Sequence, residues 1–392
     1  MPVARNRTLP IYVAAGCIFC ALAVRTFALP LRVIELGGDK VEIGLLFSVG
    51  TVTAAGLSLP AGFLADRFGK RTLLLFSIVI GGVCQAGMGL AQSVPPLFAW
   101  QAVAGIGAGA AQAALMSALV DVVPAGRLGR AMGWLTFAFQ VGFLAGPALA
   151  GTSLQWLDLR TALTISTVLF GVALAFTLWG IPATPGRDTG WNLIGPLRQI
   201  ASHRAFAVAT AGMLGATLLW GTLQAYLPVF GKEQLGLAPA QIGYMVAIQA
   251  VANGLARIPG GRIVDRLARR GTLVVAGLGV YSVAVAILPH LTGFVSATLL
   301  LSLSVPILAT VYIALGVVFT SLSTAETRGV AMGVYGMVLY LGLGFGPAIF
   351  GAIMEHAGYL AGFTACAATG LLLAGLTAAL RSERLRPRPA SA

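Results

Sequence analysis

The chain has 392 residues, of which 58% are hydrophobic and 9% are charged, and its mean hydropathy is +0.90. A soluble domain carries about 25% charged residues, so this chain could not cover its own surface with polar groups in water. The formal net charge of +13 needs no nucleic-acid partner, because basic loops that set membrane orientation and contact anionic lipid headgroups account for it.

The apolar residues gather in twelve segments, each near the length of about 20 residues that a helix needs to cross the hydrocarbon layer. Strands of a membrane barrel would place a polar residue at every second position, and these segments do not. The first segment is of full span length and lacks a cleavage site, so we expect a span and not a signal peptide. The sequence therefore predicts an all-α membrane protein with twelve transmembrane helices. The segments are 10–34, 43–64, 72–91, 97–120, 131–154, 161–181, 206–230, 241–262, 271–289, 294–318, 330–354 and 359–380.

The basic residues predict how these spans are oriented. Most of the 25 Lys and Arg residues lie in the termini and in the loops after even-numbered spans, whereas the opposite loops hold Arg32, Lys40, Arg160 and Lys232. The positive-inside rule then places both termini in the cytoplasm. We expect an integral protein of a bacterial cytoplasmic (inner) membrane, in contact with lipid and monomeric.

Two motifs of the first half recur in the second half. GFLADRFGKR (62–71) returns as GRIVDRLARR (261–270), and GPALAG (146–151) returns as GPAIFG (346–351). Two matches in the same order indicate two structurally equivalent six-helix halves. The predicted domains are 1–181, the N-terminal six-helix half; 182–205, a cytoplasmic central loop; and 206–392, the C-terminal six-helix half with a short basic tail.

Two parallel halves of six spans are the arrangement of major facilitator superfamily transporters, and the chain resembles that superfamily along essentially its whole length. GFLADRFGKR is similar to its motif A, G-x-L-a-D-r-x-G-r-k, between spans 2 and 3. GFLAGPALAG (142–151) is similar to its motif C, G-x-x-x-G-P-x-x-x-G, which is typical of exporters that exchange substrate for protons. GLGFGPAIFG (342–351) in span 11 fits the same pattern, so motif C also admits a pure packing role.

The resemblance implies a gate built on motif A. Asp66 would lie against the start of span 11 and join a charge chain with Lys70 and with Asp121 at the inner end of span 4. A charge at a helix end is worth about 0.3–2 kcal/mol, so such a contact can hold and still break in each cycle. The alternative is ordinary loop charge that sets orientation. The predicted gating residues are Gly62, Asp66, Arg67, Gly69, Lys70, Arg71, Asp121, Asp265, Arg266 and Arg269.

Motif C would act through close helix packing and a bend. Gly142 and Gly146 form a face of small residues that lets another helix approach, and Gly151 ends the motif. Pro147 removes a backbone hydrogen bond and bends the span. If motif C has a role beyond helix packing, this bend would seal the cavity against leaks.

In the superfamily's fold, spans 1, 4, 7 and 10 line most of a central cavity, where a small-molecule substrate is expected. A charge at the middle of a span costs about 2.5–3.5 kcal/mol and is usually functional. Arg25 has such a position in span 1, so we expect it to hold an acidic or polar part of the substrate, or to pair with an internal acid or with carbonyls. The other cavity candidates, each alternatively a packing residue, are Gln101, Gln112, Trp220, Gln224, Tyr226, Asn253 and Tyr312.

The leading functional hypothesis is a secondary active transporter that exports small organic or amphipathic molecules by alternating access, coupled to protons. The spans hold no Asp or Glu at their middle, so the proton-coupling candidates are Asp121, Glu35 and Asp66. An uptake carrier or uniporter for an organic anion bound by Arg25 is the alternative within the same class. A membrane sensor that does not transport is the alternative of another class.

An enzyme is not expected, because His203, His290 and His356 are far apart and no catalytic set surrounds them. Cys17 and Cys20 have the C-x-x-C spacing of metal sites, but no further ligands lie nearby in the sequence. No Walker A sequence appears. We therefore expect neither a metal nor a cofactor.

Overall fold

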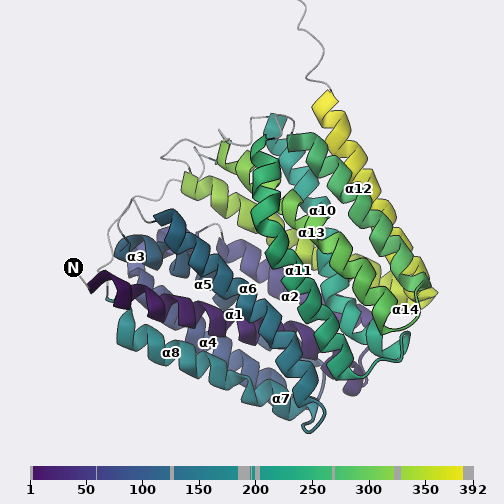
Figure 1. Cartoon of the computed structure of the whole chain (residues 1–392). Coiled ribbons are helices and arrows are strands. Elements are labelled where there is room, and N and C mark those ends of the chain that lie inside the picture. Colours follow the sequence, from purple (N-terminus) through teal and green to yellow (C-terminus); the bar gives the residue numbers. More distant parts are fainter. Residues whose placement is uncertain are drawn as a thin grey trace, which may run out of the picture.

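The computed structural model describes residues 3–58, 60–123, 128–183, 195, 197–198, 204–266, 270–321 and 328–382. Regular structure within these ranges is entirely helical, which confirms the predicted all-α class (Figure 1). The first half contains α1 (Val3–Glu35), α2 (Lys40–Ser58), α3 (Ala61–Phe68), α4 (Lys70–Leu90), α5 (Pro95–Val122), α6 (Leu128–Ser153), α7 (Leu159–Ile165) and α8 (Thr167–Gly180). The second half contains α10 (Arg204–Glu233), α11 (Pro239–Arg266), α12 (Arg270–Ile287), the 3₁₀ turn η2 (Leu288–His290), α13 (Phe294–Ser321) and α14 (Arg328–Ser382).

The helices are consistent with twelve membrane crossings. Ten stretches of the described residues are long and apolar enough to span a bilayer. One of them, Gly333–Leu380, covers two crossings, because Gly358 at φ +81° turns the chain between two halves of α14. The 28 residues of α11 are absent from that set, and the helix contains polar residues such as Gln241, Gln249, Asn253 and Arg257. At 1.5 Å per residue α11 is nevertheless about 42 Å long, which suffices to cross.

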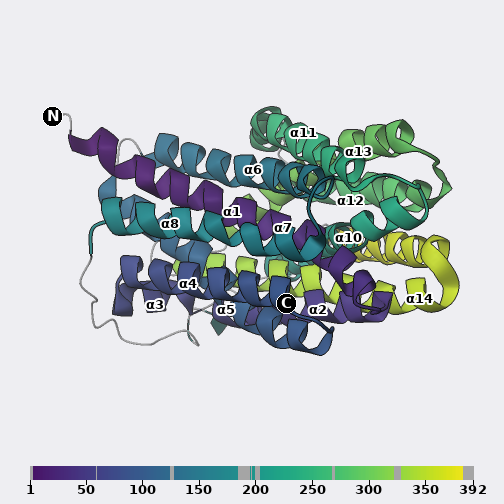
Figure 2. The same ribbon diagram turned by 90° about the horizontal axis from the view of Figure 1, so that it is seen from below.

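The two halves meet along two pairs of helices. In the first half α1 packs on α6 and α8, while in the second half α10 and α12 pack on α14. Between the halves, α2 packs on α14 and α6 packs on α11. These two contacts correspond to each other under the sequence repeat, because α2 matches α11 and α6 matches the first part of α14. Figure 1 shows the first half at the lower left and the second at the upper right, and Figure 2 shows α6 beside α11 from below.

Glycines allow the closest of these helix contacts. A Cβ on Gly151 of α6 would lie 2.5 Å from the Pro239 carbonyl oxygen at the start of α11. Gly142 and Gly146 pack on α1 instead, where a Cβ on either would lie 2.7 Å from backbone atoms of Cys20. Motif C therefore joins one helix of its own half to one helix of the other half.

Candidate translocation site

Arg25 lies inside the bundle on α1. The residue is only 7% exposed, and its Nη1 atom has no hydrogen-bond partner among the described residues. The described ion pairs do not include it. Tyr340 of α14 and Cys84 of α4 lie within electrostatic reach of its charge. A buried guanidinium with a spare donor is costly unless something binds it, and its planar fork matches a carboxylate or phosphate.

The other predicted cavity residues differ in their surroundings. Gln101 is buried on α5 against Gly50 of α2, and its Oε1 atom has no hydrogen-bond partner in the described part of the chain. Trp220 and Gln224 of α10 are half-buried. Gln112 is exposed on α5, and the structure does not bring it together with the others.

A polar contact crosses from α6 to α11. Gln140 of α6 donates from Nε2 to Asn253 Oδ1 at 3.1 Å, and Arg257 donates from Nε to the same oxygen at 3.2 Å. Arg257 lies one helical turn after Asn253, and Tyr335 of α14 lies within electrostatic reach of it. Tyr335 is in turn within reach of the half-buried Tyr312, a predicted cavity residue on α13. Sequence analysis selected Asn253 but missed Arg257, although the spacing of four residues on a helix indicates a shared face.

A cluster of charges joins the halves where α2 begins. Lys40 Nζ of α2 lies 3.6 Å from Glu233 Oε2 of α10 and 3.5 Å from Glu355 Oε2 of α14. The Lys40 amide also donates to Glu355 Oε2 at 3.1 Å, and the Tyr359 hydroxyl donates to Glu233 Oε2 at 2.8 Å. The ammonium lies 5.2 Å from the centre of the Tyr359 ring. We name Lys40, Glu233, Glu355 and Tyr359 the Lys40 clamp; its residues were not among the sequence-predicted sites.

Tyr226, a predicted cavity residue, belongs to the same end of the molecule. Its side chain is fully buried, and its hydroxyl oxygen lies 2.7 Å from the Lys40 carbonyl oxygen and 2.9 Å from that of Pro347. A Cβ on Gly351 would come within 2.7 Å of the same Lys40 carbonyl oxygen. In this conformation Tyr226 therefore closes the contact between α2 and α14.

The structure brings part of the predicted motif A gate together. Lys70 at the start of α4 forms an ion pair with Asp121 near the end of α5, as the resemblance implied. Gly69 has φ +87°, which a side chain would disfavour, and it makes the sharp turn between α3 and α4. Arg71 donates from Nη2 to the Leu178 carbonyl oxygen at 2.9 Å.

The remaining gate residues have other surroundings. Arg67 lies 5.9 Å from the ring centres of Phe63 and Phe68, and Arg266 is exposed at the end of α11. Gly62 and Asp66 lie in α3 and Asp265 lies in α11, but the two Asp side chains are outside the described part, as is Arg269. The contact of Asp66 with span 11 remains a prediction.

Glu35, a proton-coupling candidate, is already paired. Its Oε2 atom lies 2.7 Å from Arg32 Nη1, and Arg32 Nη2 donates to the Ala91 carbonyl oxygen at 2.9 Å. The pair therefore ties the end of α1 to the end of α4.

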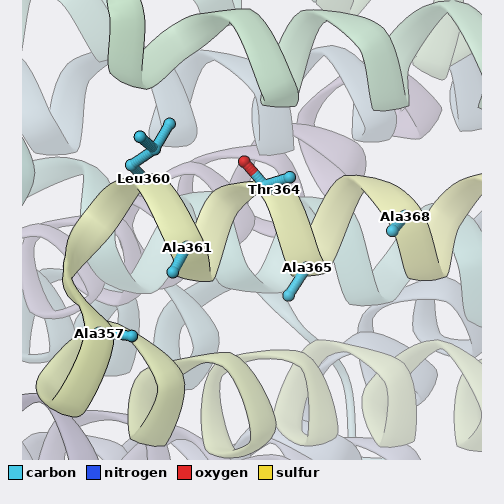
Figure 3. Close-up of a pocket in the computed structure, with 6 residues that line it drawn as sticks. All are labelled: Ala357, Leu360, Ala361, Thr364, Ala365 and Ala368. Atoms are coloured by element: carbon cyan, nitrogen blue, oxygen red, sulfur yellow. The ribbon is translucent and has the colours of Figure 1, made fainter.

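An open hollow of about 640 Å³ lies on the last part of α14 (Figure 3). The side chains that line it are uncharged and mostly single methyl groups, so it offers nothing to hold a charged substrate. They belong to Ala357, Leu360, Ala361, Thr364, Ala365 and Ala368.

Comparison with known proteins identifies the family. Residues 11–310 and 232–392 match the model described as Major Facilitator Superfamily. The 3-(3-hydroxy-phenyl)propionate transporter of Escherichia coli (strain K12) is 26% identical over 364 residues, which cover 90% of this chain and 87% of the relative. The multidrug resistance protein MdtH of Salmonella arizonae is 24% identical over 252 residues, which cover 64% of this chain and 61% of MdtH.

Solved structures share the fold. A bacterial homolog of the human lysosomal transporter Spinster, in an inward-facing and unoccupied conformation, superposes with a TM-score of 0.78 and 16% identity over 100% of both chains. The nucleoside transporter NupG gives a TM-score of 0.76 at 17% identity, covering 96% of this chain and 99% of its own.

Proposed function

The chain belongs to the Major Facilitator Superfamily, and from this premise we propose that it moves a small organic anion across a membrane by alternating access, with Arg25 as the residue that binds the anionic group. The observation that carries the proposal is the buried, unpartnered Nη1 atom of Arg25. An arginine stays protonated at physiological pH, so it cannot itself be the proton carrier.

The surroundings of Arg25 support a site between the halves. Arg25 belongs to the first half, whereas Tyr340 within its electrostatic reach belongs to the second. A ligand bound there would contact both halves, so its affinity would depend on how the halves are placed relative to each other. The name of the Escherichia coli relative specifies a propionate, which carries a carboxylate, and this supports an anionic substrate for the present chain.

The Lys40 clamp supports an inference about which end of the carrier is closed in this structure. It holds α2 against α10 and α14 at the end opposite to the chain termini, and the positive-inside rule predicts that the termini are cytoplasmic. The Spinster homolog of the same fold is inward-facing. We therefore infer a carrier of the bacterial cytoplasmic membrane that is closed toward the outside.

Proton-coupled export is the second candidate, and the packing of motif C favours it. A Cβ on Gly146 would lie 2.9 Å from the Val24 amide nitrogen, so the motif contacts the turn of α1 that carries Arg25. Movement of α6 would therefore displace the turn of α1 that carries Arg25. MdtH, whose name specifies multidrug resistance, supports export, and Asp121 in its ion pair with Lys70 is the titratable candidate.

Transport into proteoliposomes tests these proposals with 3-(3-hydroxyphenyl)propionate as the probe. Replacing a charge-assisted contact costs about 1.5–3 kcal/mol, so Arg25→Gln should weaken affinity about tenfold to hundredfold. Arg25→Lys should retain part of it, and Arg160→Gln, at an exposed arginine, is the control. Equal affinity in wild type and both Arg25 variants would make Arg25 structural. Concentrative transport that survives collapse of the proton gradient would exclude proton coupling.

A further inference from the structure

We propose that Gln85 of α4 is a positioning residue for Arg25: its side chain holds the turn of α1 that carries Arg25 in the place where the guanidinium can bind the substrate. This inference rests on the proposed function, in which Arg25 binds the anionic group. It adds to the site a residue from α4, a helix that carries none of the cavity residues predicted from the sequence.

The side chain of Gln85 is fully buried, and its amide nitrogen reaches two other parts of the bundle. Its Nε2 atom donates to the Ala21 carbonyl oxygen of α1 at 3.2 Å and to Ser166 Oγ at 2.7 Å. Ser166 is the residue at which α7 ends and α8 begins. A side-chain amide has two N–H donors, so both are used. One side chain of α4 therefore joins α1 to the junction of α7 and α8.

The bond to Ala21 acts on the turn of α1 that carries Arg25. In a helix the carbonyl of residue 21 accepts from the amide of residue 25, so Gln85 Nε2 lies within about 6 Å of the Arg25 amide nitrogen. Side chains four residues apart also share a face of the helix. On a different face of this turn, a Cβ on Gly146 of α6 would lie 2.7 Å from the Cys20 carbonyl oxygen and 2.9 Å from the Val24 amide nitrogen. The turn is therefore held from two sides, by close packing on α6 and by a hydrogen bond from α4.

The acceptors that Gln85 bonds do not need it in order to be satisfied. The Ala21 carbonyl has its helical donor, and Ser166 Oγ itself donates to the Leu163 carbonyl oxygen at 2.6 Å. The Oε1 atom of Gln85 is buried without a hydrogen-bond partner among the described residues, and an unsatisfied buried acceptor is unfavourable. An apolar side chain of the same size would avoid that cost. What the amide adds is a fixed distance between α4 and the turn that carries Arg25.

A double-mutant cycle tests the inference, with titration calorimetry of 3-(3-hydroxyphenyl)propionate binding to the purified full-length protein. Gln85→Met keeps the volume of the side chain and removes both bonds, so it should weaken affinity about threefold to tenfold, which is part of the worth of a charge-assisted contact. In the Arg25→Gln background the same substitution should leave the affinity unchanged, because Gln85 acts through Arg25. Ser77→Ala is the matched control and should bind as wild type does. Ser77 is a buried polar residue of the same helix, and its hydroxyl donates to the Leu73 carbonyl oxygen of that helix at 2.9 Å.

A second variant loosens Gln85 without replacing it. Ser166→Ala removes one of the two Gln85 bonds with a smaller change of shape, so it should lower the affinity at least twofold, again only while Arg25 is present. Equal loss of affinity from Gln85→Met with and without Arg25, or no loss in both Gln85→Met and Ser166→Ala, would overturn the inference and leave the role of Arg25 intact. Unchanged affinity in Arg25→Gln, or no binding by wild type, would refute the proposed function as well.

Discussion

Replacing Lys40 with methionine is expected to open the end of the molecule that the Lys40 clamp holds shut. Lys40 contributes the single cation of the clamp, and the two carboxylates on α10 and α14 both face it, at 3.6 Å and 3.5 Å. Methionine keeps an unbranched side chain, one atom shorter than that of lysine, and loses the charge. The amide of residue 40 can still donate to Glu355, so the start of α2 keeps one of its bonds.

The size of the effect follows from how deeply the pairs are buried. The side chain of Lys40 is 18% exposed, while those of Glu233 and Glu355 are 34% and 32% exposed. Exposed ion pairs contribute about 0.2–1 kcal/mol each, and these partly shielded pairs belong near the upper limit. The contact with the Tyr359 ring adds about 0.5–1 kcal/mol. A loss of about 1–3 kcal/mol shifts the equilibrium between conformations about 5- to 150-fold toward the open form.

Distances between spin labels measure this shift. Labels at Trp156 of the first half and Thr292 of the second, both exposed at the clamp end, should move apart in Lys40→Met. The four native cysteines are replaced first. Lys232→Met, which removes an exposed cation beside Glu233, should leave the distances unchanged. Identical distance distributions in wild type and Lys40→Met would show that the Lys40 clamp does not hold this end of the molecule closed.

Two further contacts should respond to substitution. Gly44→Ala is expected to abolish transport while membrane insertion persists, because the added Cβ would clash with the Pro347 carbonyl as α2 closes on α14. Gly56→Ala on the same helix meets open space and should transport normally, so equal vesicle transport by both variants would contradict the packing argument. Asp121→Asn removes the described ion pair with Lys70 and should change the rate of transport but not the affinity for substrate. Lys70→Gln should do the same, and a change in affinity alone would place the pair in the binding site.

The sequence predicted the fold well because few backbone structures are stable within a lipid bilayer. Backbone groups in hydrocarbon must bond within the segment, so long apolar runs become helices whatever their tertiary partners are. The contact between Lys70 and Asp121 was predictable for another reason. The resemblance to the superfamily's motif A implies which residues contact each other as well as where they lie in the sequence. The turn at Gly358 was nearly located, because the predicted spans end at 354 and resume at 359.

The contacts between the halves were not predictable in the same way. Lys40 meets Glu233 and Glu355, which lie far along the chain, and no periodicity links them. From the sequence alone these residues are loop charges that set orientation. Arg257 lies near the end of the predicted span 241–262, so its position alone did not indicate the contact with Asn253.

The separation of charge in the molecule gives a reason why substrate and conformation should be linked. At the Lys40 clamp one ammonium group faces two carboxylates, whereas Arg25 has no described carboxylate partner. In the proposed mechanism, the approach of the halves around an empty site would remove water from the Arg25 guanidinium without supplying a compensating charge, and that desolvation is costly. On the proposed function, a bound anion would remove this cost. In the proposed mechanism, closing the end opposite to the clamp would then be favourable with substrate present. Because rigid halves that rock cannot keep both ends shut, the clamp would open.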